Sequence, residues 1–386
     1  MDTFTLDKAY IANTYARFPV ELVSGKGSVV FDKDGKRFID MATGIAVNTF
    51  GIADDEWIAA VTAQLGKLQH TSNLYYTEPC AKLAQMLCER TEMKKVFFSN
   101  SGAEANECAI KVARKYAADK KGKEYHTVVT LRNSFHGRTI TTLAATGQDV
   151  FHNDFLPLTE GFAYANAGCI EELEVMLSSR KCAAVMIEVV QGEGGVMPLD
   201  KDYVSAVAQL CKSRDVLLIC DEVQTGNGRT GELYGYINYG IKPDIVSTAK
   251  GLGGGLPIGA TILGEKVADI LTPGSHGSTF GGNPVCCAGA LSILSRIDDK
   301  VLQGVKERSA YITEELSGAK GIKSVTGLGL MLGIETEKDA GEIIAKCIKN
   351  GVLVIKAKNK LRLLPALNIP KDLLAEAAAV IKAACA

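Results

Sequence analysis

Residues 244–255 have the sequence DIVSTAKGLGGG, in which a short β-branched run is followed by a lysine and then by glycines. The run predicts a buried strand that ends at Thr248, and the glycines predict a turn. A buried ammonium group is costly unless it is neutralised or used in chemistry. Lysine also forms imines with carbonyl compounds once its pKa falls below the free value of about 10.4. Lys250 is therefore a candidate Schiff-base lysine, and the alternative is a solvated lysine at the end of a strand or helix.

The composition is that of an ordinary globular protein. The chain has 386 residues, enough for two or three domains, of which 47% are hydrophobic and 23% charged. Its formal net charge of -1 provides no basic field that would attract nucleic acid. We therefore expect no nucleic-acid partner.

The 11 cysteines do not indicate a disulfide scaffold or a zinc site. No pair has zinc-finger spacing, and several lie inside apolar helix or strand patterns. The cysteines in apolar patterns are Cys88, Cys108, Cys211, Cys220 and Cys347. Buried, reduced cysteines are typical of the cytoplasm, so we expect a cytoplasmic protein without a metal site.

The sequence also lacks the usual signs of export and membrane insertion. The N-terminal segment MDTFTLDKAY has no basic region followed by an apolar core. Residues 272–295 contain no Lys, Arg, Asp or Glu, but they are too rich in Gly, Ser, Thr and Pro for a membrane helix. We expect a soluble chain that does not bind membranes.

Between residues 95 and 250 the sequence alternates between apolar strands and amphipathic helices. The predicted strands are 96–99, 127–131, 183–190, 216–220 and 244–248, and the predicted helices include 103–116 and 201–213. Strands rich in Val and Ile that alternate with helices indicate a mainly parallel, doubly wound sheet, which belongs to the α/β class.

The pattern changes after about residue 283. Helices are predicted first, followed by short strands mixed with helices, which is typical of a smaller α+β domain. Residues 1–50 have the pattern of an arm with short strands, which we expect to complete that small domain. The predicted division is an N-terminal arm at 1–50, a large domain at 51–283 and a C-terminal small domain at 284–386.

Unusual residues follow several predicted strands, at the edge where ligands bind in an open parallel sheet. Ser101, Gly102 and Ala103 lie at the start of a predicted helix whose N-terminus suits a phosphate, although a plain serine N-cap would have the same sequence. Asp221 follows an apolar run, where it suits a protonated ring nitrogen or, alternatively, the cap of a helix or turn.

Other strand ends carry further candidates. Phe135 could stack on a planar ring, and Arg138 could bind a carboxylate, the alternative being a core aromatic beside a surface arginine. Glu193 lies in a glycine-rich segment, where a solvated glutamate is an equal alternative. The loop that contains Ser278 and Thr279 suits a second phosphate contact or a simple turn.

Six segments, in this order and spacing, resemble those of the class III aminotransferases, which are pyridoxal phosphate enzymes of fold type I. The segments are SNSGAEAN (99–106), SFHGRT (134–139), EVVQGEGG (188–195), DEVQTG (221–226), STAKGLGGG (247–255) and GSTFGGNP (277–284). The resemblance covers nearly the whole chain. Within the class, TYARFPVELVSGKG (14–27) and HTSNLYYTEP (70–79) are most similar to the acetylornithine aminotransferases of arginine biosynthesis.

This resemblance implies a pyridoxal 5'-phosphate cofactor joined to Lys250, with Asp221 paired to its pyridine nitrogen. It also implies a homodimer with shared active sites, in which Thr279 reaches the phosphate of the partner subunit. The cofactor-binding residues that it implies are Ser101, Gly102, Ala103, Phe135, Asp221, Val223, Gln224, Lys250 and Thr279.

The resemblance further implies that the terminal amine of N2-acetylornithine is transferred to 2-oxoglutarate, which gives N-acetylglutamate 5-semialdehyde and glutamate. Arg138 would hold the carboxylate far from the reacting amine, and Arg362 the α-carboxylate of glutamate or 2-oxoglutarate. Glu193 would mask Arg362 while the ω-amine substrate is bound. Tyr15 and Ser278 would lie beside the substrate.

Alternative substrates are succinylornithine, N-succinyl-diaminopimelate, 4-aminobutyrate and ornithine. Ile45 stands where ornithine aminotransferases commonly have a tyrosine, which favours the acetylated substrate, whereas Tyr15 matches a tyrosine of those same enzymes. Ile52 and Asn227 also depart from the usual pattern, outside any catalytic role. A dehydrogenase or a non-catalytic binding module is disfavoured, because neither G-x-G-x-x-G after an early strand nor G-x-x-x-x-G-K-S/T is present.

Overall fold

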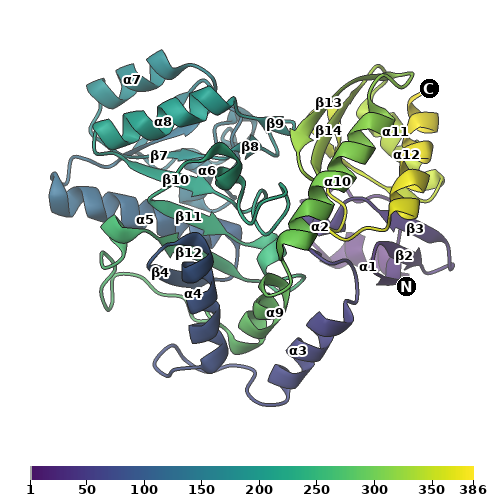
Figure 1. Ribbon diagram of the computed structural model, residues 1–386, viewed down its shortest axis with the longest axis horizontal. Coiled ribbons are helices and arrows are strands. Elements are labelled where there is room, and N and C mark those ends of the chain that lie inside the picture. Colours follow the sequence, from purple (N-terminus) through teal and green to yellow (C-terminus); the bar gives the residue numbers. More distant parts are fainter. Residues whose placement is uncertain (1) are drawn as a thin grey trace.

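The structure is a computed structural model that describes residues 2–386. Figure 1 shows two bodies side by side. The larger body contains a seven-stranded sheet with helices on both faces, and the smaller contains a four-stranded sheet that packs against C-terminal helices. The predicted α/β class is confirmed.

The large sheet is mainly parallel, as predicted. Its strands, in order across the sheet, are β4 (Lys95–Ser99), β12 (Gly259–Leu263), β11 (Ile245–Thr248), β10 (Leu217–Asp221), β7 (Cys182–Ile187), β5 (Thr127–Leu131) and β6 (Phe162–Ala165). Only β12 runs antiparallel to its neighbours β11 and β4. The segment 249–258 between β11 and β12 is too short for the crossover that a parallel pair requires.

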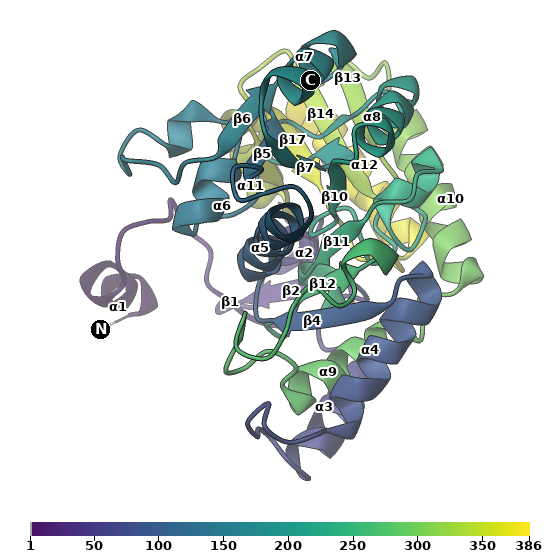
Figure 2. The ribbon, with the colours of Figure 1, turned by 90° about the vertical axis from the view of Figure 1, so that its left-hand side faces the viewer.

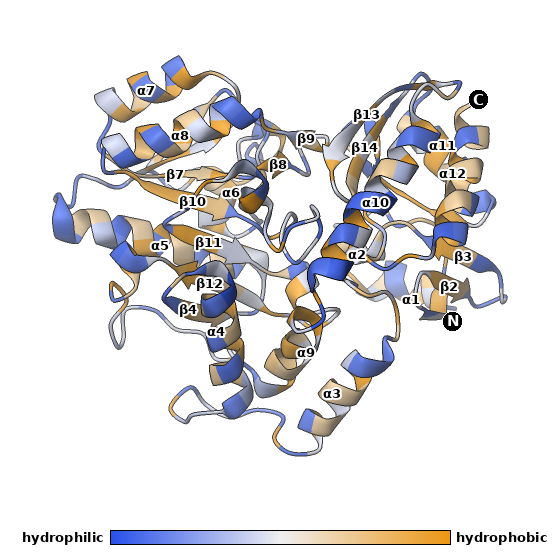
Figure 3. Ribbon diagram, viewed as in Figure 1, coloured by the Kyte–Doolittle hydropathy of each residue, from blue (hydrophilic) through white to orange (hydrophobic). Residues whose placement is uncertain are grey.

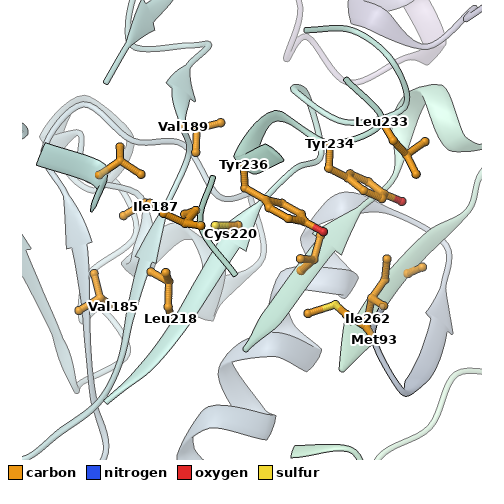
Figure 4. Close-up of a cluster of buried hydrophobic side chains, with 14 of the residues drawn as sticks. Met93, Val185, Ile187, Val189, Leu218, Cys220, Leu233, Tyr234, Tyr236 and Ile262 are labelled. Carbon is orange, nitrogen blue, oxygen red and sulfur yellow. The ribbon is translucent and has the colours of Figure 1, made fainter. Parts of the chain in front are cut away.

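The central strands are buried on both faces, which explains their continuous apolar sequences. In β7, Val185 and Ile187 belong to one hydrophobic core, whereas Ala184 and Met186 belong to another on the opposite face. Figure 4 shows the first of these cores, with Leu218 of β10 beside the β7 side chains. Each large aliphatic side chain buried in this way contributes about 1.5–3 kcal/mol to folding.

Helices cover both faces of the sheet. Helix α5 (Gly102–Lys120) packs on one face through its side chains at helical spacing, and α7 (Ile170–Ser179) and α8 (Lys201–Ser213) cover the other (Figure 1). The α5 residues predicted to share one face are all buried: Ala105, Ala109, Val112, Ala113 and Tyr116. The two faces of the sheet are thereby closed, and its carboxyl-terminal edge is left for a site.

Two further four-stranded sheets lie outside the large sheet, and one of them combines N-terminal and C-terminal strands. One sheet contains β13 (Ile322–Leu328), β14 (Met331–Thr336), β17 (Lys360–Leu363) and β16 (Ile355–Ala357), and the other contains β1 (Leu22–Lys26), β2 (Val29–Asp32), β3 (Arg37–Asp40) and β15 (Val352–Leu353). Because β3 pairs with β15, the N-terminal arm and the C-terminal segment share a sheet. The predicted domain boundaries at residues 50 and 283 stay a prediction.

The remaining helices complete the two bodies. They are α1 (Thr3–Tyr10), α2 (Thr43–Ala46), α3 (Asp55–Leu65), α4 (Glu78–Thr91), α6 (Ile140–Ala145), α9 (Pro284–Leu294), α10 (Asp299–Leu316), α11 (Ala340–Lys349) and α12 (Lys371–Cys385). Helix α9 packs against α3 and α4 in the larger body and is hydrophobic along most of its length (Figure 3). Helix α1 has no buried residue and lies apart from both bodies (Figure 2).

The predicted strand 183–190 is divided in the structure. Strand β7 ends at Ile187, and β8 (Val190–Gln191) pairs with β9 (Met197–Pro198) as a separate hairpin, because the glycine-rich segment 192–195 turns the chain back.

Among the helices that the structure describes, none is long and apolar enough to cross a bilayer.

Candidate active site

A cavity of about 630 Å³ lies at the carboxyl ends of the parallel strands. Ligands bind at this edge in open α/β sheets. The predicted site residues that line it are Tyr15, Ser101, Gly102, Ala103, Phe135, Arg138, Asp221, Val223, Gln224 and Lys250. The fold thus gathers residues from widely separated segments into one cavity.

Lys250 follows β11 directly and begins a short 3₁₀ helix, η3 (Lys250–Leu252). Its side chain lines the cavity and is mostly removed from solvent. This burial lowers the pKa of Lys250 to about 8. A lysine in this state supplies more of the neutral amine near neutral pH than a free lysine does, which favours imine formation and proton transfer.

Asp221 is the last residue of β10, and its carboxylate is only 4% exposed. Its Oδ2 accepts hydrogen bonds from Nδ2 of Asn106 at 2.7 Å and from Nδ1 of His136 at 2.8 Å. Its Oδ1 accepts from the backbone N–H of Val223 at 3.0 Å. These donors fix the orientation of the carboxylate on the cavity wall.

The N-terminus of α5 forms another part of the wall. Ser101 is the N-cap, and its Oγ accepts a hydrogen bond from the backbone N–H of Glu104 at 3.2 Å. A Cβ on Gly102 would lie 2.6 Å from Cγ1 of Val223, so only glycine fits there without a shift. Free N–H groups and the helix dipole make this end suitable for a phosphate.

Arg138 lies at the rim of the cavity on aromatic side chains. Its guanidinium carbon is 4.1 Å from the centre of the Phe151 ring and 5.5 Å from the centre of the Phe135 ring. Arg138 forms no ion pair with any residue from 2 to 386. A guanidinium supported in this way is available to bind a carboxylate.

Arg362 and Glu193 lie beside the cavity instead of on its lining. Nη1 of Arg362 donates to Oε1 of Glu193 at 2.5 Å and to Oε1 of Gln224 at 3.2 Å. Arg362, on β17, is 3% exposed, and its Nε has no partner among the described residues. Gln224, which lines the cavity, connects this ion pair to it.

Sequence reasoning missed three buried polar residues at the site: Asn106, His136 and Glu188. Asn106 and His136 hold Asp221, and Oε2 of Glu188 accepts from the backbone N–H of Phe135 at 2.8 Å. Burial, with a contribution from nearby Asp221, raises the pKa of Glu188 well above its usual range. All three lie within quoted motifs, but no local pattern indicates that they meet around one carboxylate.

Ser278 and Thr279 line a second cavity, of about 710 Å³, instead of the one that contains Lys250. Asn100 lies between the two, because it lines the first cavity and its Nδ2 donates to Oγ of Ser278 at 3.2 Å. Within one chain, the structure does not bring these two predicted residues to Lys250.

The Lys250 cavity fits the pyridoxal 5'-phosphate implied by the resemblance. Its volume lies within the range of about 300–1,000 Å³ that is typical of ligand sites. Lys250 supplies an amine, Asp221 a fixed carboxylate and the start of α5 a phosphate-binding helix end. Phe135 adds an aromatic side chain to the same wall.

Comparison with known proteins identifies the family. The model of the family described as "Aminotransferase class-III" matches residues 10–385. An acetylornithine aminotransferase from Haemophilus ducreyi is 50% identical over 378 residues, which are 97% of this chain and 96% of that protein. A succinylornithine transaminase from Citrobacter koseri is 44% identical over 368 residues, 93% of this chain and 90% of that protein.

The solved structures agree with the sequences. An ornithine aminotransferase from Toxoplasma gondii superposes with a TM-score of 0.94 at 33% identity and covers 99% of this chain and 93% of its own. The fold, the lysine-containing cavity and the match over nearly the whole sequence lead to one conclusion. This chain belongs to the class-III aminotransferases.

Proposed function

We propose that this aminotransferase moves the terminal amine of N2-acetylornithine to 2-oxoglutarate, with pyridoxal 5'-phosphate as its cofactor. The observation that carries the proposal is the meeting of Lys250 and Asp221 on the wall of one cavity. The relative from H. ducreyi is an acetylornithine aminotransferase, and the T. gondii ornithine aminotransferase has PLP at partial occupancy in its active site. These two proteins support the choice of substrate and cofactor.

When bound, pyridoxal phosphate supplies an electron sink for the carbon that loses its proton. The start of α5 would hold its phosphate, Asp221 its ring nitrogen and Phe135 a face of its ring. Lys250 would provide the amine that attaches the cofactor and, once released, would take a proton from the donor carbon as a general base. The same amine, now protonated, would act as a general acid and deliver that proton to the cofactor carbon to which the lysine had been attached.

Two arginines would orient the substrates by binding their carboxylates. Arg138 is unpaired among the described residues and would bind the carboxylate of the acylated diamino acid. Arg362 is paired with Glu193, so it is masked in this state and would be released for the α-carboxylate of glutamate or 2-oxoglutarate. One cavity can thereby accept two substrates of different shape.

The test uses the purified enzyme in its cofactor-bound form. Acetylornithine added without a keto acid should bleach the yellow cofactor absorbance, and 2-oxoglutarate should restore it. An enzyme that stays unbleached with every amine tested would contradict the aminotransferase assignment to this site.

Succinylornithine is the second candidate donor, because a succinylornithine transaminase is 44% identical to this chain. Steady-state values of kcat/KM for acetylornithine, succinylornithine, N-succinyl-diaminopimelate, 4-aminobutyrate and ornithine decide between them. The proposal requires the highest value for acetylornithine, and a value at least about tenfold higher for another amine would reject it.

We also infer a homodimer with shared sites. Leu74, Tyr75, Tyr76 and Phe280 are largely exposed, with Leu74 at 86%, and such apolar patches often mark interfaces. The patch adjoins Thr279, which lies outside its own Lys250 cavity. A partner subunit could therefore supply Thr279 to the site.

Subunit mixing tests the shared site. Lys250→Ala and Thr279→Ala subunits each lose activity, but a hybrid dimer would keep one intact site. Random exchange should therefore restore about one quarter of wild-type activity. Hybrids that form without any recovery would contradict the sharing of residues between subunits.

We further infer two domains and a cytoplasmic location. Separate hydrophobic cores, one around β7 and β10 and one around β14 and β17, support a large and a small domain, and helix α9 contributes to the core of the large one. All 11 cysteines are free, which suits a reducing compartment. Limited proteolysis that cuts near residues 50 and 283, and fractionation of the producing cells, test these two inferences.

A further inference from the structure

Lys250 has a backbone conformation that needs support. Its φ is +47°, in the left-handed region that side chains with a Cβ avoid at a cost of about 1–2 kcal/mol. Such strain persists only where neighbouring groups hold it, and it is frequent at functional sites. The groups that hold this turn therefore decide where the lysine side chain points.

Asn227 holds the residues directly before Lys250. It lies in the turn after β10, is 2% exposed and has a φ of +58°. Its Nδ2 donates to Oγ1 of Thr248 at 3.1 Å and to the carbonyl oxygen of Ala249 at 3.2 Å. The amide thus links the turn after β10 to the end of β11.

The asparagine is not explained by stability alone. Its Oδ1 is buried and has no hydrogen-bond partner among residues 2–386. A buried polar atom without a partner costs about 1–3 kcal/mol. The Nδ2 hydrogen bonds to Thr248 and Ala249 offset this cost, so holding these two residues is the function we assign to the side chain.

Two other side chains hold the turn after the lysine. Oγ1 of Thr49 donates to the carbonyl oxygen of Gly251 at 2.7 Å. Nε1 of Trp57 donates to the carbonyl oxygen of Gly253 at 3.0 Å. These contacts fix the segment that leaves Lys250, whereas Asn227 fixes the segment that enters it.

We propose that Asn227 is a positioning residue, which fixes the end of β11 so that the amine of Lys250 stays in the cavity where it attaches the cofactor and transfers protons. This proposal rests on the proposed role of Lys250. Asn227 itself contacts neither substrate nor cofactor in the proposal. It acts on the reaction only through the lysine.

The charged groups around Lys250 make its titration a readout of its position. Asp221 and Glu188 face it from the ends of β10 and β7, Glu193 from the segment between β8 and β9, and Arg362 from β17. Burial is the main reason for the lowered pKa of Lys250. A lysine free to leave its buried position would therefore titrate at a higher pH.

The test follows imine formation between the cofactor-free protein and pyridoxal phosphate, in which the amine and the aldehyde condense with loss of water. The rate is measured by absorbance from pH 6 to pH 10 for the wild type, Asn227→Leu and Asn227→Gly. The rate should rise with pH as Lys250 loses its proton, and the pH at which it reaches half of its maximum is the midpoint. We expect this midpoint to be higher by at least about half a pH unit in both variants than in the wild type. In the cofactor-loaded variants, kcat should fall at least about fivefold with KM changed less than about twofold.

The two substitutions separate the effect of losing the Asn227 side-chain amide from the effect of changing its backbone preference. Leucine fills the space but disfavours a positive φ, whereas glycine adopts a positive φ freely and removes only the side chain. If the leucine variant fails to fold by circular dichroism, the glycine variant decides. A folded variant whose midpoint is unchanged and whose kcat is within about twofold of the wild-type value overturns the positioning role. A variant that loses stability without a change in midpoint also overturns it.

A parallel Lys250→Ala protein keeps the two proposals apart. If it still forms the imine at the wild-type rate, the proposed role of Lys250 is wrong. If it forms none while both Asn227 variants behave as wild type, only the positioning role of Asn227 is wrong.

Discussion

Gln224 accepts a hydrogen bond from Arg362 at 3.2 Å and so connects the Glu193–Arg362 ion pair to the cavity that contains Lys250. A paired arginine offers no free site to a substrate carboxylate until its partner moves. In the proposed reaction, one half-reaction uses the terminal amine of the donor and the other uses the α-amine of glutamate. A partner that can be displaced therefore allows one cavity to discriminate between ω-amine and α-amine substrates.

Replacing Glu193 by alanine should weaken this discrimination. The released Arg362 would bind an α-carboxylate without competition, and a charge-assisted hydrogen bond is worth about 1.5–3 kcal/mol. The ratio of kcat/KM for acetylornithine to that for glutamate should fall about tenfold to hundredfold. Glu193→Gln keeps the acceptor oxygen, so its ratio should lie between those of the wild type and Glu193→Ala. An unchanged ratio in Glu193→Ala would exclude the masking role.

Replacing Lys250 by alanine should abolish turnover. The variant loses both the imine-forming amine and the general base, so we expect kcat to fall by at least about 10⁴-fold. Stopped-flow absorbance with acetylornithine measures the loss, and circular dichroism checks the fold. Activity close to wild type in a folded variant would rule out Lys250 as the reactive residue.

Asp221→Asn tests the carboxylate while keeping its shape. The amide carries no charge to stabilise a protonated ring nitrogen, so kcat should fall about 10²–10³-fold. His136→Gln should have a smaller effect, because His136 only supports Asp221 through a 2.8 Å hydrogen bond. An equal loss in both variants would indicate that the hydrogen-bond network matters as a whole, contrary to this ranking.

Gly102→Ala tests the fit of the helix end at the proposed phosphate site. The added Cβ would lie 2.6 Å from Cγ1 of Val223, so the start of α5 or Val223 must shift. The dissociation constant for pyridoxal phosphate, measured by titration of the cofactor-free protein, should rise at least about tenfold. Val223→Ala removes the clashing atoms, and the double variant should recover most of this loss. Absence of recovery would place the cause elsewhere.

Much of this arrangement was predictable from the sequence because it depends on local patterns. Strand β5 and helix α8 have the predicted bounds, since an apolar run or an amphipathic repeat decides each of them. Strand β12 was missed because it follows a loop instead of a helix and runs antiparallel. Lys250 and Asp221 were identifiable as unusual residues at strand ends.

The surroundings of these two residues were not predictable in the same way. Glu188 comes close to Asp221 because β7 and β10 are neighbours in the sheet, and His136 reaches Asp221 from the segment after β5. Strand order is a property of the whole fold, and no local spacing encodes it. The partners of a strand-end residue therefore become known only with the topology.

The lowered pKa of Lys250 predicts a stability effect in the cofactor-free protein. The folded lysine releases its proton near pH 8, whereas the unfolded lysine keeps it to about pH 10.4. The unfolded state therefore binds more protons between these values, so stability rises with pH across this window. Below pH 8 the full cost of burying the charge is present. Lys250→Met removes the charge and should raise the free energy of unfolding by about 1–3 kcal/mol at pH 7.

This gain should shrink as the pH rises from 8 towards about 10, because the wild-type lysine then becomes neutral in the folded state. Urea unfolding of both cofactor-free proteins at pH 7 and pH 9.5 measures it. Lys120→Met, at the exposed end of α5, is the matched control and should show no comparable pH dependence. A Lys250→Met gain that is constant across this range would mean that the charge of Lys250 is not what limits stability, and that its pKa is close to that of a free lysine.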